Sequence, residues 1–325
     1  MAAEAYVLGV DGGATKTVAL IGTKTKILAR GESGSSNYHN IGAVAAGKAI
    51  KAAYADAKKQ AGLHRGRVEV AVVALAAVDS VNGIRIARRF VRRANLARKT
   101  FVIHDSVAAF YAATGGEPGI IVNSGTGCFA AGVNRAGECV RVGGWGFLID
   151  DKGSAFDIGM KAITLAFRMM DGRTPRTGLV ALLTNKLRVR RLDEILDGIY
   201  SNRIGVEQIA ELAPSISRAS RHDEVCKQIL RETATSLAEL ACTTARRLKM
   251  TKTTFPLAMV GGGFKSGNDF VERFTSIVRA ECPHARFLRL KDEPAKGAYL
   301  IATKLACQSP KTLPLNDRWL RGVVN

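Results

Sequence analysis

Residues 6–22 read Tyr-Val-Leu-Gly-Val-Asp-Gly-Gly-Ala-Thr-Lys-Thr-Val-Ala-Leu-Ile-Gly, which is two short apolar runs joined by a glycine turn. Apolar runs of this length on either side of a Gly-Gly turn are typical of a β-hairpin. The run Ile27–Ala29, which follows the polar turn Thr23–Lys26, predicts a third strand. The chain therefore opens with three strands in succession.

Outward from this hairpin, helical and strand patterns alternate. The alanine-rich stretch Ile41–Ala61 predicts a helix that Gly62 can close. Val68–Val78 is almost continuously apolar, which predicts a buried strand. An arginine-rich helix, the strand Thr100–Ile103 and an alanine-rich helix ending at Thr114 come next. This alternation predicts an α/β layer with some parallel strand pairing.

The opening pattern then repeats. Residues 120–142 show the same succession as residues 7–29: a strand, a glycine turn with threonine, a strand, a polar turn and a strand. We therefore expect two related α/β domains that face each other across a cleft, residues 1–115 and 116–325. The second domain should carry extra helices, at 153–170 and across 179–248 with a break at Pro214, and the last helix, 295–306, is free to pack back on the first domain.

The composition is that of a globular protein with an unusually basic surface. Of 325 residues, 47% are hydrophobic and 23% charged, while 48 basic and 28 acidic residues give a net charge of +20. The basic residues are spread out, apart from a dense stretch of Arg85, Arg88, Arg89, Arg92, Arg93, Arg98 and Lys99. Several of these arginines share one helix face, which indicates either a solvated face or a site for a phosphate-rich partner. No motif of a nucleic-acid-binding module is present, so binding to nucleic acid is not expected.

The six cysteines form no Cys-x-x-Cys pair, so the sequence indicates neither a zinc ribbon nor a thioredoxin-like motif. The N-terminal residues do not resemble a secretion signal, and no run of about 18 apolar residues predicts a membrane span. We expect a cytoplasmic protein with reduced thiols.

Three glycine turns, each at the end of an apolar strand, carry the chemistry. Asp11–Thr17 combines an acid, two glycines, two threonines and a lysine. Glycines let backbone amides approach phosphate oxygens, a lysine adds positive charge, and an aspartate can hold hydrated Mg²⁺. Ser124–Gly127 and Gly261–Gly263 are turns of the same kind. Taken alone, Gly12-Gly13 could be only a hairpin turn; the P-loop motif and the dinucleotide-binding Gly-x-Gly-x-x-Gly motif are both absent.

With these turns in their order, the chain resembles the BadF/BadG/BcrA/BcrD-type ATPase family of the actin-like (ribonuclease H-like) ATPase and sugar kinase superfamily. Within it, the chain is most similar to N-acetylglucosamine kinases and archaeal ATP-dependent hexokinases. The resemblance covers residues ~5 to ~305. It rests on the following segments: Val10–Thr17, Ser36–Gly42, His104-Asp105, Gly125–Gly127, Gly143–Gly146, Asp150–Ala155 and Gly261–Gly263.

The resemblance implies binding of ATP and Mg²⁺, with the metal at Asp11. It places the phosphates and the adenosine on the remaining turn residues, which are Gly12, Gly13, Thr15, Lys16, Thr17, Gly125, Thr126, Gly127, Gly261, Gly262, Gly263 and Lys265. It also implies a cytoplasmic homodimer whose substrate is a small-molecule sugar, and phosphorylation at the 6-hydroxyl.

Asp105 is the candidate catalytic base. A sugar hydroxyl is a poor nucleophile at neutral pH, and a positioned carboxylate that accepts its proton assists attack on the γ-phosphate. By spacing alone, Asp105 reads as the N-cap of the helix that ends at Thr114. The resemblance favours the catalytic role, and one residue can serve both.

The resemblance also implies a sugar site formed by Asn37, His39, Gly144, Trp145, Asp150 and Asp151 together with Asp105. Amide and imidazole groups can hydrogen-bond hydroxyls in a fixed pattern. Other interpretations stay open: Asn40 as a helix N-cap, Trp145 as a buried core residue, and one of the adjacent aspartates as a cap. The sequence does not distinguish glucose, glucosamine and N-acetylglucosamine.

Two other functions remain possible for this family. Activators of 2-hydroxyacyl-CoA dehydratases hydrolyse ATP and hold an iron–sulfur cluster between subunits, which requires cysteine ligands at the dimer interface. Cys128 and Cys139 are expected on neighbouring strands of the repeated unit, where buried apolar thiols are the ordinary interpretation. A sugar-sensing repressor would carry an added helix-turn-helix module, and the first strand begins too early in this sequence for one.

Overall fold

The computed structural model describes residues 5–63, 68–76, 78, 80–289 and 292–307. The chain divides into two compact units. The first contains the residues up to 119 together with 133–139 and those from 289 onward, and the second contains residues 120–132 and 140–288. The outer limits of the two predicted domains, Met1 and Asn325, lie outside the described residues.

The first sheet has five strands in the order β3-β2-β1-β4-β5. Its strands are β1 Tyr6–Gly12, β2 Lys16–Gly22, β3 Ile27–Gly34, β4 Val68–Leu75 and β5 Lys99–His104. β1 pairs antiparallel with β2 and parallel with β4, and β4 pairs parallel with β5. The carboxyl ends of three adjacent strands therefore meet at one edge, at Gly12, Leu75 and His104. The predicted strand to Val78 ends at Leu75, and Ala77 lies outside the described residues.

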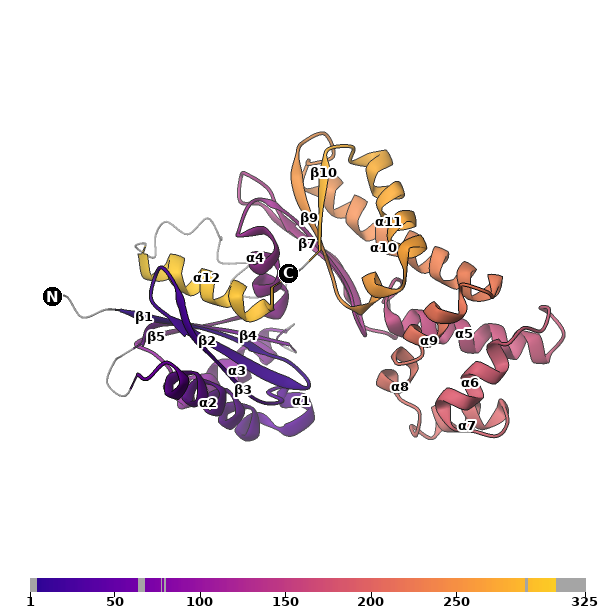
Figure 1. Cartoon of the computed structure of the whole chain (residues 1–325), viewed down its shortest axis with the longest axis horizontal. Coiled ribbons are helices and arrows are strands. Elements are labelled where there is room, and N and C mark those ends of the chain that lie inside the picture. Colours follow the sequence, from indigo (N-terminus) through magenta and orange to yellow (C-terminus); the bar gives the residue numbers. More distant parts are fainter. Residues whose placement is uncertain (1–4, 64–67, 77, 79, 290–291, 308–325) are drawn as a thin grey trace. The chain divides into compact units, whose positions relative to one another are not determined.

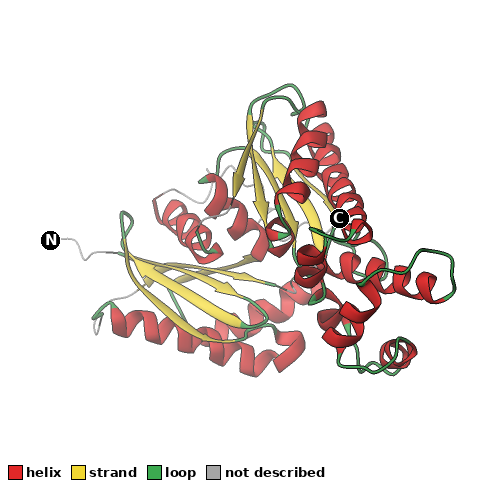
Figure 2. Ribbon diagram, turned by 45° about the vertical axis from the view of Figure 1, so that its right-hand side comes forward, coloured by secondary structure: helices red, strands yellow, loops and turns green. Residues whose placement is uncertain are grey.

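Helices cover both faces of this sheet (Figures 1 and 2). One face carries α2 (Ala43–Gln60) and α3 (Val81–Ala94), and the other carries α4 (Asp105–Thr114) and α12 (Pro294–Cys307). α2 buries small and aliphatic side chains spaced three or four residues apart, which keeps one stripe of the helix against the sheet: Ala46, Ile50, Ala53 and Ala57. The predicted helix 41–61 corresponds to α2, and a single helical turn, α1 (Tyr38–Ile41), precedes it.

The helix α12 lies directly on β1, although nearly 300 residues separate them in sequence. A Cβ placed on Gly9 of β1 would lie 2.1 Å from the backbone nitrogen of Tyr299. A Cβ on Gly297 would lie 1.8 Å from the carbonyl oxygen of Ala108 in α4. Only glycine at these two positions lets the three backbones come this close. The Tyr299 hydroxyl also donates a hydrogen bond of 2.8 Å to the carbonyl of Lys26, at the β2–β3 turn.

The second sheet repeats the topology of the first. Its order is β10-β9-β6-β7-β8, with β6 Gly119–Ser124, β7 Cys128–Val133, β8 Cys139–Gly143, β9 Phe255–Val260 and β10 Ala285–Arg289. Read from the opposite edge, β8-β7-β6-β9-β10 corresponds strand for strand to β3-β2-β1-β4-β5. β6 and β9 pair in parallel, as β1 and β4 do. This correspondence confirms the predicted fold class of two related α/β domains of the actin-like ATPase type.

The predicted extra helices of the second unit are also present. They are α5 Ala155–Met170, α6 Leu179–Leu187, α7 Asp193–Tyr200, α8 Val206–Ala210, α9 Ala213–Ala219, α10 Glu224–Arg247 and α11 Asn268–Glu281, with the 3₁₀ helix η1 Gly262–Lys265. Pro214 lies in the first turn of α9, where its missing N–H leaves no hydrogen bond unmade. Among the described residues, no helix is both long and apolar enough to cross a membrane.

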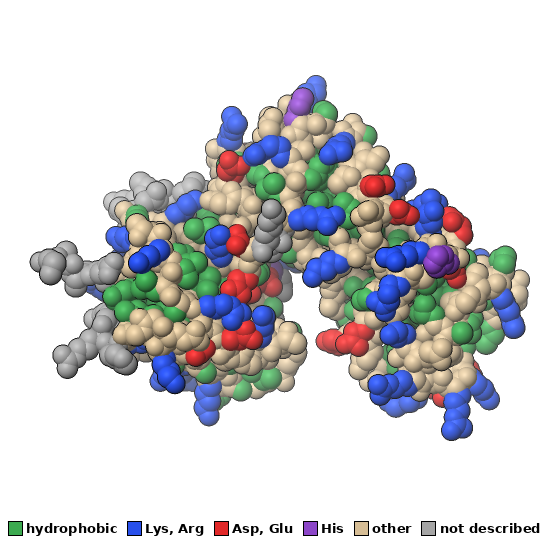
Figure 3. Space-filling model, viewed as in Figure 1, with side chains coloured by type: hydrophobic (Ala, Val, Ile, Leu, Met, Phe, Trp, Pro, Cys, Tyr) green, Lys and Arg blue, Asp and Glu red, His purple; other side chains and the backbone are tan. Residues whose placement is uncertain are grey.

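The surface of each unit is strongly basic, in line with the net charge of +20. Figure 3 shows lysine and arginine side chains scattered over the visible face of each unit, with fewer acidic side chains among them. Some acidic groups are paired on the surface, for example Asp292 with Lys296 at 2.8 Å. Exposed pairs of this kind contribute little to stability, so they do not explain the excess of positive charge.

The close packing of α12 predicts a large effect for one methyl group. We expect Gly297→Ala to destabilise the first unit by at least about 2 kcal/mol, because the new Cβ overlaps backbone that cannot move independently. The matched control is Gly178→Ala, since a Cβ at Gly178 meets no atom within 4 Å. Chemical denaturation of both variants measures their free energies of unfolding. Equal stabilities for the two variants would contradict the packing described here.

Candidate active site

Asp11 is the penultimate residue of β1, next to the turn that leads into β2. In the register of the sheet it lies opposite Val18 of β2 and beside Ala74 of β4. The turn is held by a 3.0 Å hydrogen bond from the backbone N–H of Gly13 to the carbonyl of Lys16. Because the turn lies at the carboxyl edge of the parallel strands, it occupies the position where ligands bind in open α/β sheets.

Asp105 lies at the same edge, immediately after β5. The structure corrects its expected role as a cap: the N-cap of α4 is His104, whose Nδ1 accepts the backbone N–H of Ser106 at 3.1 Å. Asp105 is the first residue of the helix, and its side chain is 40% exposed. Its Oδ1 lies 2.9 Å from His104 Nδ1. The carboxylate thus lies beside the His104 ring and is partly open to solvent.

The electrostatics of Asp11 reflect a concentration of carboxylates. The pKa of Asp11 is raised from 3.8 to about 7, first by burial and then by the negative charges of Asp105 and Glu293, while the charge of Lys16 acts in the opposite direction. Glu293 immediately precedes α12 and forms an ion pair with Arg30 at 3.0 Å. Neither Glu293 nor His104 was assigned a role in the site from the sequence; Glu293 reaches this edge only through the packing of the C-terminal helix, whereas His104 is the neighbour of Asp105 in sequence.

A loop carrying candidate sugar-binding residues packs against the Gly12-Gly13 turn. The Ser36 N–H donates to the Gly13 carbonyl at 3.1 Å. The Ser36 hydroxyl is buried without a hydrogen-bond partner, and a Cβ on Gly12 would lie 2.3 Å from it. Gly12 is therefore required for the loop to approach the turn. The structure brings two predicted motifs together at this place.

Within that loop, Asn37 caps α1, since its Oδ1 accepts the backbone N–H of His39 at 3.0 Å. Its amide NH₂ group stays available for a ligand. His39 is exposed, with its ring centroid 4.2 Å from that of Tyr38. Asn40, expected as a possible cap, lies inside α1 instead.

The residues after Gly13 differ in whether their side chains are exposed to a ligand. Thr15 and Lys16 are exposed in the turn, and Lys16 forms a long ion pair of 3.6 Å with Glu32. Thr17 is buried, and its hydroxyl donates to the Gly34 carbonyl at 2.8 Å. Thr15 and Lys16 can therefore meet a phosphate directly, whereas the Thr17 hydroxyl secures β2 against β3.

In the second unit, the Gly125–Gly127 turn follows β6 as the Gly12-Gly13 turn follows β1. The Gly125 N–H donates to the Gly127 carbonyl at 2.9 Å, and Thr126 is exposed at its tip. The Asp151 Oδ1 accepts the backbone N–H of Cys128 at 3.2 Å, and a Cβ on Gly127 would lie 3.0 Å from Asp151 Oδ2. Asp151 therefore supports the turn. Burial raises its pKa above the usual range, and the neighbouring charge of Asp150 adds to this.

The third glycine turn packs on the second. A Cβ on Gly263 would lie 2.0 Å from the Ser124 hydroxyl, and one on Gly261 would lie 2.3 Å from the Ser124 carbonyl oxygen. Gly261 also has φ of +98°, a conformation that favours glycine. Gly262 and Lys265 are exposed beside them. Two predicted nucleotide-binding turns, from β6 and β9, are thus in direct contact within one unit.

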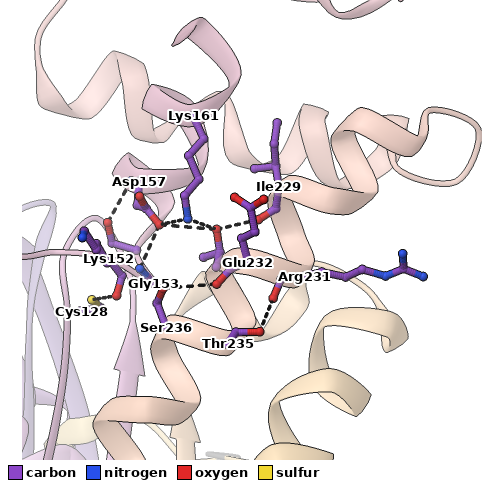
Figure 4. A network of polar contacts seen from close by, with 12 residues as sticks. Cys128, Lys152, Gly153, Asp157, Lys161, Ile229, Arg231, Glu232, Thr235 and Ser236 are labelled. Carbon is purple, nitrogen blue, oxygen red and sulfur yellow. Dashed lines mark hydrogen bonds and ion pairs between the residues drawn. The ribbon is translucent and has the colours of Figure 1, made fainter. Parts of the chain in front are cut away.

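A polar network behind these turns was not predicted. Asp157 in the first turn of α5 accepts the Gly153 N–H at 3.1 Å and the Lys161 ammonium at 2.8 Å (Figure 4). The Ser124 hydroxyl donates to the Gly153 carbonyl at 2.6 Å, which connects this network to the Gly125–Gly127 turn. The sequence did contain a signal: Ser154 and Asp157 have the spacing of a helix capping box, and Ser154 is indeed the N-cap of α5.

The segment between β8 and α5 is the most exposed apolar part of the second unit. Gly144 has φ of +75°, and the segment continues through Trp145, whose exposed fraction of 69% excludes the buried-core interpretation. Leu148 and Ile149 are also exposed, at 82% and 78%. Among the described residues, no hydrogen bond to the Asp150 carboxylate is found, so Asp150 is the one of the two adjacent aspartates that is free to meet a ligand.

Cys128 and Cys139, the two candidate ligands of an iron–sulfur cluster, are poorly placed to bind one. Cys128 is buried, and its thiol donates to the Lys152 carbonyl at 3.2 Å. Burial raises the pKa of the Cys128 thiol far above its usual range and that of Cys139 to about 12. The Cys128 thiol is thus enclosed and already hydrogen-bonded, which does not suit a cluster shared between subunits.

The site suits Mg²⁺ held through few protein ligands. In the part of the chain that the structure describes, no three His, Cys, Asp or Glu side chains gather closely enough to hold a metal alone. Mg²⁺ is usually bound by one or two carboxylates together with substrate phosphates and water. Asp11, surrounded by the negative charges of Asp105 and Glu293, is the carboxylate whose environment a divalent cation would relieve.

The raised pKa of Asp11 predicts a pH-dependent stability. Unfolded Asp11 ionises near pH 3.8 and the folded residue only near 7, so its contribution to stability falls as the pH rises between these values and stays low above them. Asp11→Asn removes this loss. The difference in free energy of unfolding between the variant and the wild type should therefore be more favourable to the variant at pH 8 than at pH 4, by roughly 2 to 4 kcal/mol. Urea denaturation at both pH values tests this; a difference that does not change with pH would contradict it.

Comparisons with known proteins agree with this geometry. An N-acetylmuramic acid/N-acetylglucosamine kinase of Clostridium acetobutylicum is 28% identical over 299 residues, which is 91% of this chain and 98% of the relative. An N-acetyl-D-glucosamine kinase of Dictyostelium discoideum is 29% identical over 93% of this chain and 98% of the relative.

Among solved structures, a Chromobacterium violaceum protein provisionally described as an N-acetylglucosamine kinase has a TM-score of 0.75. It is 25% identical, with 92% of this chain and 99% of that chain covered. The ROK hexokinase of Thermus thermophilus shares the fold at a TM-score of 0.60 and 16% identity, over 94% of this chain and all of that one. The sequence profile of the BadF/BadG/BcrA/BcrD ATPase family matches residues 8–302, and the chain belongs to this family.

Proposed function

We propose that this protein is an ATP-dependent sugar kinase that phosphorylates a hexose, amino-hexose or N-acetylamino-hexose at its 6-hydroxyl. The observation that carries the proposal is the position of Asp105. Its partly exposed carboxylate follows β5 at the sheet edge that also holds Asp11 and the Gly12-Gly13 turn. A proton acceptor and a phosphate-binding turn at the same edge of one sheet are the two parts that phosphoryl transfer to a hydroxyl requires.

The relatives support the same reaction class. Both curated relatives are named as N-acetylglucosamine kinases, and both are covered over 98% of their length. Their names include glucosamine-derived and muramic acid substrates, so N-acetylglucosamine is the first substrate to test. A glucokinase of Streptomyces griseus with the same fold binds glucose and AMPPNP.

In the proposed reaction, Asp105 accepts the proton of the sugar 6-hydroxyl as that oxygen attacks the γ-phosphorus. The new oxygen–phosphorus bond forms, the bond between the γ-phosphorus and the β–γ bridging oxygen breaks, and ADP leaves with the electron pair. The Asp105 side chain is 40% exposed, so a hydroxyl can approach its carboxylate.

The proposal assigns phosphate binding to the two glycine turns and to Lys16. Glycines in the Gly12-Gly13 and Gly125–Gly127 turns have no side chains to obstruct the turn backbone, which favours close approach of phosphate oxygens. Gly261–Gly263 and Lys265 are assigned to the adenosine. Mg²⁺ beside Asp11, when bound, would neutralise charge on the transferring phosphate.

For the sugar, the proposal assigns Asn37 and His39 in the first unit. Each has a polar group free to bond hydroxyls after its structural contacts are made. In the second unit it assigns Gly144, Trp145 and Asp150. An exposed indole suits the apolar face of a sugar ring, and a free carboxylate suits its hydroxyls. Asp151 is assigned to support of the Gly125–Gly127 turn as well as to the sugar site. The homodimer and the cytoplasmic location belong to the same proposal.

An iron–sulfur activator is the weaker alternative. It requires thiolate ligands, and the enclosed Cys128 thiol, already donating to Lys152, does not offer one. The kinase hypothesis therefore assigns a role to more of the candidate site residues than the activator hypothesis does.

The test is an ADP-release assay with MgATP against glucose, glucosamine, N-acetylglucosamine and N-acetylmuramic acid. We expect turnover to require a sugar, and Asp105→Asn to lower kcat by about 10²- to 10⁴-fold because the proton acceptor is lost. Asp292→Asn, an exposed aspartate of the same unit, should retain wild-type kcat. ATP hydrolysis that ignores every sugar, or an active Asp105→Asn enzyme, would reject the proposal.

The network in Figure 4 predicts an effect on ATP from a residue that does not contact it. Asp157→Asn loses the charge that holds Lys161 and weakens the bond to the Gly153 N–H. We expect the KM for ATP to rise by about tenfold or more, since one hydrogen bond to a charged group contributes roughly 1.5 to 3 kcal/mol. The KM for sugar should change less. Asp171→Asn, which disturbs only an exposed pair with Arg173, is the control and should leave both constants unchanged.

A further inference from the structure

A second feature of the first unit has no part in the proposed reaction. A groove of about 930 Å³ runs between α3 and the strand β5. Its lining consists of arginines from α3 and the loop after it, together with four consecutive residues of β5: Arg85, Arg88, Arg89, Arg92, Arg98 and residues 100–103. We call this feature the arginine groove. All of its lining residues belong to the first unit.

The arginine groove has a large uncompensated positive charge. Five arginines line it and no aspartate or glutamate does. Among the described residues, Arg88, Arg89 and Arg92 form no ion pair, and all three are exposed. Arg98 has a partner in Glu69, but at 3.5 Å and with 63% of its side chain exposed. The charge is therefore available to an anionic ligand.

The other wall of the groove is the edge of a sheet. β5 is the last strand in the order β3-β2-β1-β4-β5, and within the described part of the chain it pairs on one side only, with β4. An edge strand presents unpaired N–H and C=O groups that can accept one further strand. Binding of an extended peptide to such an edge is a known recognition mode, in which main-chain hydrogen bonds supply affinity and side-chain pockets supply specificity.

The two walls match in length. α3 has 14 residues and spans about 21 Å, while β5 has 6 residues and spans about 20 Å. One extended segment of about six residues would therefore lie along the whole arginine helix while pairing with the whole strand. Alternate side chains of an added strand point to opposite faces of the sheet, so every second residue would face α3.

We infer that the arginine groove binds an acidic polypeptide segment, which adds to β5 as a sixth strand and directs alternate Asp or Glu side chains at the arginines of α3. Arginine suits this role because its planar guanidinium pairs with carboxylates in a bidentate geometry. The inference does not rest on the proposed kinase activity.

Two other occupants fit less well. A second copy of this chain carries its own net charge of +20 and would be repelled. Single-stranded nucleic acid would match the charge, but such sites commonly use aromatic platforms for base stacking, and Phe101 is the one aromatic side chain in the lining, itself half-buried. A bound nucleic acid would also not add to β5 as a further strand, so the unpaired N–H and C=O groups of that edge would have no role.

The test uses fluorescence anisotropy with the full chain and a labelled eight-residue peptide of alternating glutamate and valine. We expect saturable binding that weakens as salt rises, because charges are neutralised on binding. The double variant Arg88→Glu/Arg92→Glu should weaken binding at least tenfold. The matched control Arg190→Glu/Arg221→Glu makes the same charge change at exposed positions of the second unit and should bind nearly as the wild type does.

Two further peptides test the strand pairing without altering the protein. Each carries backbone N-methyl groups on one alternate set of residues, so each removes the N–H groups along one edge of the added strand. One of them should lose at least tenfold in affinity and the other should bind normally. Equal binding of both would overturn the inference, since it would mean that charge alone holds the peptide.

A single-stranded RNA of eight nucleotides provides the competing outcome. RNA binding tighter than that of the peptide, and lost in Arg88→Glu/Arg92→Glu, would replace the acidic peptide with nucleic acid and overturn the inference. Sugar-dependent ADP release by the double variant at the wild-type rate would establish that it is folded, because neither arginine belongs to the proposed catalytic machinery.

Discussion

The contact on which the first unit depends is the close approach of α12 to β1. Gly9 and Gly297 have no side chains, and only this lets the C-terminal helix rest backbone to backbone on the central strand and on α4. β1 carries Asp11 to the sheet edge, and Glu293 just before α12 reaches the same edge. The helix therefore fixes the strand and also contributes to the electrostatics of its end. A hydrophobic face alone would not set the distance so closely, because larger side chains pack at several separations.

The second unit reaches a comparable arrangement by different means. Its two glycine turns are held against each other by Ser124, and the segment before α5 is held by Asp157 through Gly153 and Lys161 (Figure 4). Each partly buried polar atom in this network has a partner, which is the condition under which such groups favour one conformation. Backbone amides of a turn are useful for binding phosphate only when the turn is held rigidly before the ligand arrives.

Charge is distributed in two opposing ways in the first unit. The surface is basic, with its densest positive charge in the arginine groove, yet the edge that holds Asp11, Asp105 and Glu293 is locally acidic. Burial and like charges make ionised Asp11 unfavourable, a condition often found where a site is built to receive a cation. Positive charge beyond this edge attracts anionic ligands over a distance of about a Debye length.

The sequence by itself determined the strands, the three glycine turns and the repeated supersecondary unit, because each is a pattern of neighbouring residues with the period of a strand or the chemistry of a turn. These patterns predicted the α/β class, and together with the family resemblance they predicted the candidate residues Asp11, Asp105 and Gly125–Gly127. Only the tertiary structure decided that His104 caps α4, that Asp151 supports a turn while Asp150 stays free, and that Trp145 is exposed. The packing of α12 on β1 and the Asp157–Lys161 network belong to the same group. These features join residues that are distant in the chain, or choose between adjacent candidates with equal local propensity, and the choice depends on contacts that exist only once the sheets and helices have assembled.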